Sequence, residues 1–190
     1  MAGTRVPRRA VSDPPWVASL LGDTRWAWLW AIVRVYVGYQ WFEAGLHKVT
    51  DPAWVRTGAA LQAYWQRAVQ IPAQGRPPVT YDWYREFLTF LLNSGSHTWF
   101  AKLVAYGELV MGIFLIVGLF TGFAAFFGAF ANFNFMLAGS ASTNPVLFLL
   151  AVLLMLAWKI AGYWGLDYWV LPAVGTPWKS VPTTAPERGG

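Results

Sequence analysis

The fold is decided by one stretch of sequence, residues 103–139, which reads LVAYGELVMGIFLIVGLFTGFAAFFGAFANFNFMLAG. A membrane-spanning helix needs about 20 mostly apolar residues, so this stretch is too long for one crossing of a bilayer core about 30 Å thick. Its middle, from Gly118 to Gly122, is glycine-rich and favours a turn. We therefore predict a tight hairpin of two apolar helices.

The composition of the whole chain leads to the same class of protein. Hydrophobic residues make up 56% of the 190 residues, aromatic residues 18% and charged residues 12%. Soluble domains carry about 25% charged residues, and disordered chains combine low hydrophobicity with high net charge. Both classes are excluded, which leaves an integral membrane protein. The net charge of +5, without a long basic run, favours membrane lipid as a partner and argues against nucleic acid.

Four windows are apolar enough for spanning helices, and they lie at residues 26–46, 98–120, 122–139 and 145–164. We expect an all-α integral membrane four-helix bundle within a membrane domain of residues 26–172. Residues 1–25 are predicted to be a basic cytoplasmic tail, and residues 173–190 a flexible C-terminal tail. The first window starts late and is long for a signal core, so we expect it to be retained as an anchor.

Lysine and arginine near the ends of the windows indicate the orientation. They are dense in the N-terminal tail, at Arg5, Arg8, Arg9 and Arg25, and sparse over the long loop of residues 47–97. We predict a multi-pass protein of the inner cell membrane with both termini in the cytoplasm and this loop outside.

The outer loop contains two amphipathic segments. One follows Asp51 and Pro52, which are typical of a helix start, and the other covers residues 82–92. In both, aromatic residues recur at helical spacing between polar ones. We predict two amphipathic helices that lie in the outer membrane interface with their aromatic faces toward lipid. The alternative is that they only cap the bundle.

Polar residues inside the apolar windows are the first candidates for function. Window midpoints, with 1.5 Å rise per residue, place Arg34, Glu108, Asn132 and Asn134 at similar depth. A charge near the bilayer centre costs about 2.5–3.5 kcal/mol and normally faces a partner or a cavity. We hypothesise a buried Arg34–Glu108 ion pair into which Asn132 or Asn134 is hydrogen-bonded. These residues could form a ligand or proton site, or serve only as polar contacts between helices.

A second polar cluster lies toward the outer face. Gln40, Glu43 and His47 share one stripe of the first helix, and His97 begins the second helix at a similar level. A carboxylate and an imidazole near the headgroup boundary could exchange protons with a quinone, so these four residues are a candidate quinone and proton site. A haem between the two histidines is disfavoured by their position near the surface. With no cysteine and no metal-binding motif, we expect no haem, metal ion or iron–sulfur cluster.

Three motifs in order point to a known family. They are Arg34-x3-Gly38-x3-Phe42-x2-Gly45-x2-Lys48, then Glu108-x3-Gly112-x5-Gly118-Leu119-x-Thr121, and then Asn132-x-Asn134 followed by Asn144-Pro145. Over about residues 26–172 the chain resembles the DoxX/DoxD-like family of small four-helix membrane proteins.

The resemblance implies a membrane subunit of a quinone-linked redox complex, similar to the thiosulfate:quinone oxidoreductase that passes electrons from thiosulfate to quinone. It implies quinone as a cofactor, a second protein subunit or a homo-oligomer as partner, and Lys48 as a candidate anion contact. Whether the chain itself is an enzyme stays open. The alternatives are a non-catalytic scaffold or anchor subunit and a small-solute transporter.

Overall fold

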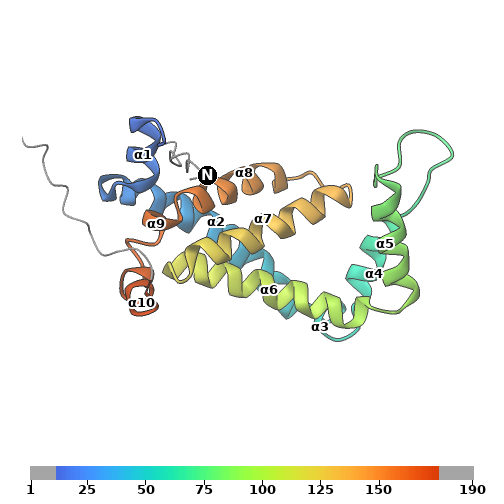
Figure 1. The fold of residues 1–190 in the computed structure, drawn as a ribbon. Helices are drawn as coiled ribbons and strands as arrows, with labels where there is room; N and C mark the ends of the chain where they lie inside the picture. Colours follow the sequence, from blue (N-terminus) through green and yellow to red (C-terminus); the bar gives the residue numbers. More distant parts are fainter. Residues whose placement is uncertain (1–11, 176–190) are drawn as a thin grey trace, which may run out of the picture.

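The computed structural model describes residues 12–175, and all regular structure in this range is helical (Figure 1). Residues 1–11 and 176–190, which hold most of the two predicted tails, lie outside the described residues. The elements are α1 (Pro15–Gly22), η1 (Thr24–Trp26), α2 (Ala27–Thr50), α3 (Pro52–Val55), α4 (Ala59–Ala68), α5 (Asp82–Asn93), α6 (His97–Val117), α7 (Thr121–Leu137), α8 (Asn144–Leu156), α9 (Trp158–Ala161) and α10 (Asp167–Ala173). The all-α expectation is confirmed.

Four helices form the body of the molecule. Helix α2 packs along α6 and α7 packs along α8, with further contacts between α6 and α7 and between α2 and α8. The predicted hairpin is present between α6 and α7. Its turn has Gly118 at φ +71° and Phe120 at φ 46°, both in the left-handed region that glycine adopts most readily. The turn therefore begins where the glycine-rich stretch begins.

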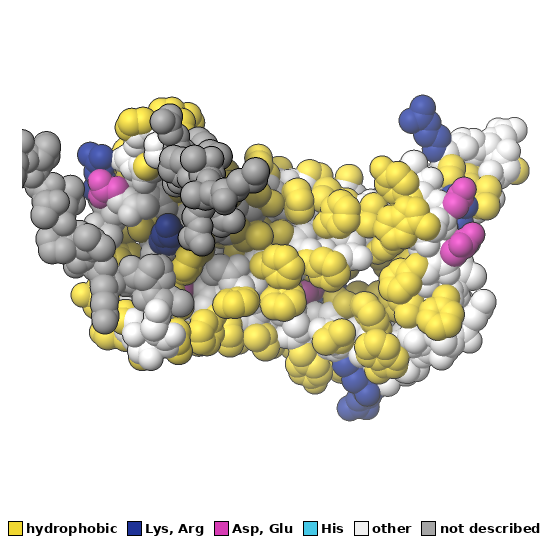
Figure 2. Space-filling view, viewed as in Figure 1, with side chains coloured by type: hydrophobic (Ala, Val, Ile, Leu, Met, Phe, Trp, Pro, Cys, Tyr) yellow, Lys and Arg dark blue, Asp and Glu magenta, His cyan; other side chains and the backbone are white. Residues whose placement is uncertain are grey.

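One of the described helices meets the length and composition that a membrane-spanning helix needs. Helix α6 is long and apolar enough to cross a membrane, as judged from length and composition. Helices α7 and α8 are apolar but have 17 and 13 residues, and α2 has 24 residues but carries Arg34, Glu43 and Lys48. On the face shown in Figure 2, hydrophobic side chains cover most of the middle of the molecule, and most of the visible charged side chains lie nearer its two ends.

The fourth predicted helix, 145–164, is wrong in its second half. Helix α8 ends at Leu156, the chain turns at Ala157, and α9 is a separate short helix. Trp158 packs against the start of α7, where a Cβ on Gly122 would lie 3.1 Å from the Cβ of Trp158. The break also turns backbone carbonyls of the following residues toward α2.

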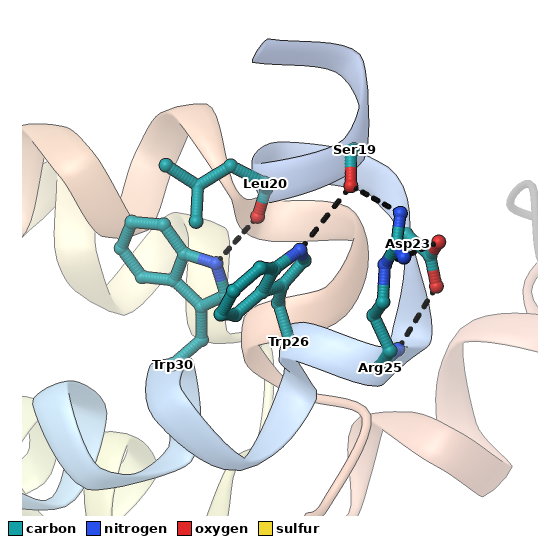
Figure 3. Close-up of polar contacts among 6 residues, drawn as sticks. All are labelled: Ser19, Leu20, Asp23, Arg25, Trp26 and Trp30. Carbon is teal, nitrogen blue, oxygen red and sulfur yellow. Dashed lines mark hydrogen bonds and ion pairs between the residues drawn. The ribbon is translucent and has the colours of Figure 1, made fainter. Parts of the chain in front are cut away.

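A helix that the sequence did not indicate lies at the start of the described chain. Within the predicted tail 1–25, α1 folds back onto the beginning of α2 (Figure 3). The indole of Trp30 donates to the carbonyl of Leu20 at 2.8 Å, and the indole of Trp26 donates to the hydroxyl of Ser19 at 3.2 Å. Helices α1 and α10 lie at the same end of the bundle (Figure 1), which we call the α1–α10 end.

Helices α4 and α5 lie across the opposite end of the bundle (Figure 1). They share a hydrophobic cluster, to which α4 contributes Leu61 and Trp65 and α5 contributes Tyr84 and Leu88. The capping alternative therefore describes α4 and the inner face of α5. The outer face of α5 still exposes aromatic side chains, including Trp83, so the predicted contact of α5 with lipid stays a prediction.

Candidate functional site

The predicted ion pair between Arg34 and Glu108 is wrong. The guanidinium of Arg34 is buried among backbone carbonyls instead. Its Nε donates to Ala161 at 3.0 Å, Nη2 to Trp164 at 3.0 Å, and Nη1 to Ile116 at 2.9 Å and to Leu115. All four acceptors lie near the α1–α10 end, at the end of α6 and around α9.

The register of α2 against α6 explains the error. A Cβ on Gly45 would lie 2.3 Å from the backbone nitrogen of Leu109, so Glu108 is level with Gly45. Gly45 follows Arg34 by about three helical turns, or about 16 Å at 1.5 Å per residue. Window midpoints put the two residues at one depth because they assume that the two helices are centred at the same level, whereas the middle of α6 lies beside the C-terminal part of α2.

Glu108 has a different cation as its partner. The ammonium of Lys48 lies 2.6 Å from Oε2 of Glu108, and the two side chains are 19% and 2% exposed. The same ammonium lies 5.2 Å from the ring centroid of Trp54, over the ring face. Lys48, the candidate anion contact, thus already has a carboxylate partner. Removing one member of such a buried pair leaves an uncompensated charge and costs about 3–5 kcal/mol.

The pair forms part of the wall of a cavity of about 600 Å³. This cavity, which we call the Glu108 cavity, lies between α2, α6, α7 and the start of α8, and α3 and α4 border it. Its polar lining combines members of both clusters that the sequence suggested separately with residues of α4, of the α7–α8 loop and of the start of α8. These polar residues are Gln40, Glu43, Lys48, Tyr64, Arg67, Glu108, Asn132, Ser140, Ser142, Thr143 and Asn144.

Asn132 is the unusual residue of this cavity. It is 0% exposed, and neither the nitrogen nor the oxygen of its amide has a hydrogen-bond partner within residues 12–175. The indole nitrogen of Trp41, another lining residue, is likewise unpartnered within residues 12–175 and lies beside Gly128 of α7. Buried polar groups are normally hydrogen-bonded, so such groups call for an explanation. The predicted hydrogen bond from Asn132 to an ion pair is therefore wrong.

Asn134 lies outside the cavity and has a structural role. Its amide oxygen accepts from the hydroxyl of Tyr84 at 3.2 Å, and its nitrogen donates to the carbonyl of Phe130 at 2.8 Å. Tyr84 also donates to the backbone carbonyl of Asn134 at 3.1 Å. These contacts attach α5 to the C-terminal end of α7. Burial raises the pKa of Tyr84 to about 12.

The four candidate quinone and proton residues separate into two groups. Gln40 and Glu43 line the cavity, with Glu43 exposed at its edge, whereas His47 is exposed and His97 is partly buried at the start of α6, and neither lines it. Within residues 12–175, no three His, Cys, Asp or Glu side chains are grouped so that they could hold a metal ion.

Sequence reasoning missed Asp167 as a buried charge. This carboxylate is 0% exposed and accepts from the backbone nitrogens of Phe120 at 2.6 Å and Thr121 at 2.9 Å, so it caps the start of α7. It also attracts the Arg34 guanidinium. Gly162 leaves room for this carboxylate, because a Cβ there would lie 2.1 Å from Oδ2 of Asp167, and this contact is visible only in the structure. Arg34 and Asp167 thus belong to a structural cluster apart from the Glu108 cavity.

Comparison with known families then places the chain. The family model DoxX matches residues 29–141, which is more than half of the sequence. The chain belongs to the DoxX family. The matched part of this DoxX-family chain contains Lys48, Glu108 and Asn132, whereas Asp167 lies beyond it. The family is membrane-associated, in agreement with the apolar composition. No curated protein and no solved structure gave a match.

Proposed function

We propose that this DoxX-family chain is a multi-pass inner-membrane subunit of a quinone-linked redox complex, and that the Glu108 cavity receives the quinone headgroup. The observation that carries the proposal is an almost fully buried carboxylate, paired with Lys48, at the wall of a cavity of about 600 Å³. Small-molecule sites have volumes of about 300–1,000 Å³ and few, converging polar groups.

Membrane crossing by α2, α6, α7 and α8 with α9 is part of the proposal. Helix α7 is the test case because it is short for a span: 17 residues give about 26 Å, against a core of about 30 Å. It exposes a run of phenylalanines to its surroundings, namely Phe123, Phe126, Phe127, Phe130 and Phe133. Soluble monomers rarely expose an apolar surface of this kind, whereas lipid tails would cover it.

The proposed orientation keeps the α1–α10 end in the cytoplasm. Both helices lie at one end of the bundle, so the described chain begins and ends on the same side (Figure 1). The basic residues of the N-terminal segment favour the cytoplasmic side for that end. The Glu108 cavity then opens in the outer half of the membrane, below α4.

Glu108 is the proposed proton-exchanging group. A quinone that gains two electrons also takes up two protons, Q + 2e⁻ + 2H⁺ → QH2, and a positioned carboxyl group can deliver or accept one of them. Lys48 balances the charge of the ionised carboxylate at 2.6 Å, and Glu43 at the cavity edge provides a second carboxylate on the way to water. In this assignment, Glu108 exchanges the proton with the quinone, and Lys48 fixes the position of the Glu108 carboxylate.

The electrons come from a partner subunit in this proposal, and thiosulfate is the candidate donor. The chain contains no cysteine, so a thiol-dependent sulfur step cannot be carried by its own residues. A partner that oxidises the donor and hands two electrons to the quinone would complete the reaction.

The proposal is tested by purifying the full chain in mild detergent and measuring bound quinone and bound proteins. We expect quinone at close to one per chain, and an oxidoreductase subunit among the bound proteins. Glu108→Gln should lower the rate of quinone reduction by the complex at least about 100-fold, the usual minimum for a general acid–base group.

Glu86→Gln is the matched control, because Glu86 is an exposed residue of α5 outside the cavity. It should leave quinone content and reduction rate unchanged. A complex that retains no quinone and reduces none with thiosulfate or another donor would contradict the proposal.

The two alternative functions make different demands on the same residues. A scaffold has no need for a cavity lined by unpartnered polar groups, and the amide of Asn132 has no partner within the described residues. A small-solute transporter uses helices that are broken at its binding site. The break at Ala157 favours this second candidate, although it lies beside the Arg34 cluster. Substrate-dependent uptake into proteoliposomes by the isolated chain would support a transporter.

A further inference from the structure

The charges that line the Glu108 cavity balance one another. Two are negative, Glu43 and Glu108, and two are positive, Lys48 and Arg67. The deeper two are joined at 2.6 Å, and Arg67 and Glu43 are exposed at the edge. An anion entering the cavity would therefore meet no free cation in its depth, and it would lie beside the carboxylate of Glu108. The cavity is built for a ligand without net charge at its buried end.

The unpartnered groups of the cavity identify what such a ligand must offer. Asn132 carries both an NH2 donor and a carbonyl acceptor, each without a partner in the described part of the chain. A carbonyl oxygen can accept from the amide NH2, and a hydroxyl group can donate to the amide oxygen. One amide side chain can therefore bind the same ring oxygen before and after reduction.

We infer that Asn132 is the ligand-binding residue that hydrogen-bonds the ring oxygen of an uncharged quinone and of its quinol, and that the cavity does not bind an oxyanion. The inference rests on the proposed function and extends it by naming the group that contacts the ligand. It also removes Lys48 from the role of anion contact, so an anionic electron donor such as thiosulfate must bind outside this cavity.

Replacement of Asn132 by leucine separates a ligand-binding role from a structural one. Leucine has nearly the same size and removes both polar atoms. Because the amide has no protein partner, the ligand-free Asn132→Leu variant should melt at the same temperature as the wild type or higher. Asn134→Leu provides the contrast on the same helix. It breaks the bonds to Tyr84 and Phe130 and should lower the melting temperature.

The binding experiment uses the full chain in detergent, titrated with decylubiquinone, decylubiquinol, thiosulfate and sulfate. We expect Asn132→Leu to weaken the binding of both decylubiquinone and decylubiquinol at least about tenfold. Neither thiosulfate nor sulfate should change the melting temperature of the wild type or of the variant. Asn93→Leu, an exposed amide at the end of α5, should bind like the wild type.

Each other outcome overturns the inference in a recognisable way. Quinone binding that is unchanged in Asn132→Leu but lost in Glu108→Gln would leave the proposed function standing and remove Asn132 from it. An anion that raises the melting temperature of the wild type but not of Asn132→Leu would show an oxyanion site. Failure of the wild type to bind either quinone form would remove both the inference and the proposed function.

Discussion

At the scale of single residues, the structure assigns different partners to two buried charges that look like a pair in the sequence. Arg34 is held by four backbone carbonyls near the α1–α10 end, and Glu108 is held by Lys48 in the cavity. Both charges are almost fully buried, so each would be costly without its own partner. The two clusters should therefore respond independently to mutation.

A pair of double-mutant cycles tests this separation. Lys48→Met and Glu108→Leu remove two groups in direct contact, so we expect a coupling of about 1–3 kcal/mol in the free energy of unfolding. Arg34→Met and Glu108→Leu remove groups several turns apart and should be additive within about 0.5 kcal/mol. Reversible unfolding in mixed detergent gives the free energies of the wild type, the three single variants and the two double variants. Coupling in the second cycle and none in the first would restore the Arg34–Glu108 pair.

The raised pKa of Tyr84 predicts how the stability of the protein changes at alkaline pH. Burial raises its pKa to about 12, from 10.0 for a free phenol, because the neutral phenol is favoured in the folded protein. The unfolded chain ionises first as pH rises, so this contribution to stability is complete below pH 10 and is lost as the pH rises to about 12. The wild type should lose more stability over this interval than Tyr84→Phe. Equal pH dependence of the two would place the hydroxyl in water.

Residue identity could be predicted from the sequence better than residue pairing. Glu108, Asn132, Glu43 and Gln40 stand out because polar groups are costly in apolar helices, and all four line the cavity. Which of these residues contact one another depends on the register of α2 against α6. Composition and hydrophobic pattern do not determine that register.

At the scale of elements, close backbone contact fixes the register of α2 and α6. A Cβ on Gly112 would lie 2.3 Å from the backbone nitrogen of Phe42, whereas a Cβ on Gly107 would meet nothing within 4 Å. The two glycines are on the same helix and differ only in what they face. This makes them a matched pair for testing the register.

Gly112→Ala should force the two helices apart and destabilise the fold by about 1–3 kcal/mol, as overpacking does. Gly107→Ala should be neutral or stabilising by up to about 1 kcal/mol, since alanine favours helix. Thermal unfolding of the two variants gives the comparison. A Gly112→Ala variant as stable as Gly107→Ala would mean that α2 and α6 do not approach this closely.

The length of the apolar runs was enough to predict the long helices, but not the break after α8 or the short helix α1. The windows 98–120 and 122–139 agree closely with α6 and α7, because a glycine-rich turn separates two uninterrupted apolar runs. The break at Ala157 and the helix α1 were missed. Both depend on contacts between distant segments, such as Trp158 against Gly122 and Trp30 against Leu20, rather than on local pattern.

At the scale of the whole molecule, the two ends of the bundle hold different buried polar groups. The α1–α10 end holds the Arg34 and Asp167 cluster, and the other end holds α4, α5 and the Glu108 cavity. Membrane insertion with these ends on opposite sides would place the cavity on the outer side. This arrangement can be measured without a structure.

Cysteine labelling is suited to the measurement because the sequence has no native cysteine. Gly22→Cys marks the end of α1, where a side chain meets nothing within 4 Å, and Gln74→Cys marks the exposed α4–α5 loop. A membrane-impermeant maleimide added to intact spheroplasts should label position 74, and position 22 only after lysis. Labelling of both positions from one side would contradict a bundle that crosses the membrane.

Photolabelling can show whether a quinone binds in the Glu108 cavity. A short-chain azidoquinone bound to the full chain is activated by light, and the modified peptides are identified by mass spectrometry. We expect label within residues 40–48 and 132–147, and we expect it to be reduced by excess unlabelled quinone and by Asn132→Leu. Label confined to the exposed phenylalanine face of α7, and insensitive to that substitution, would contradict binding in this cavity.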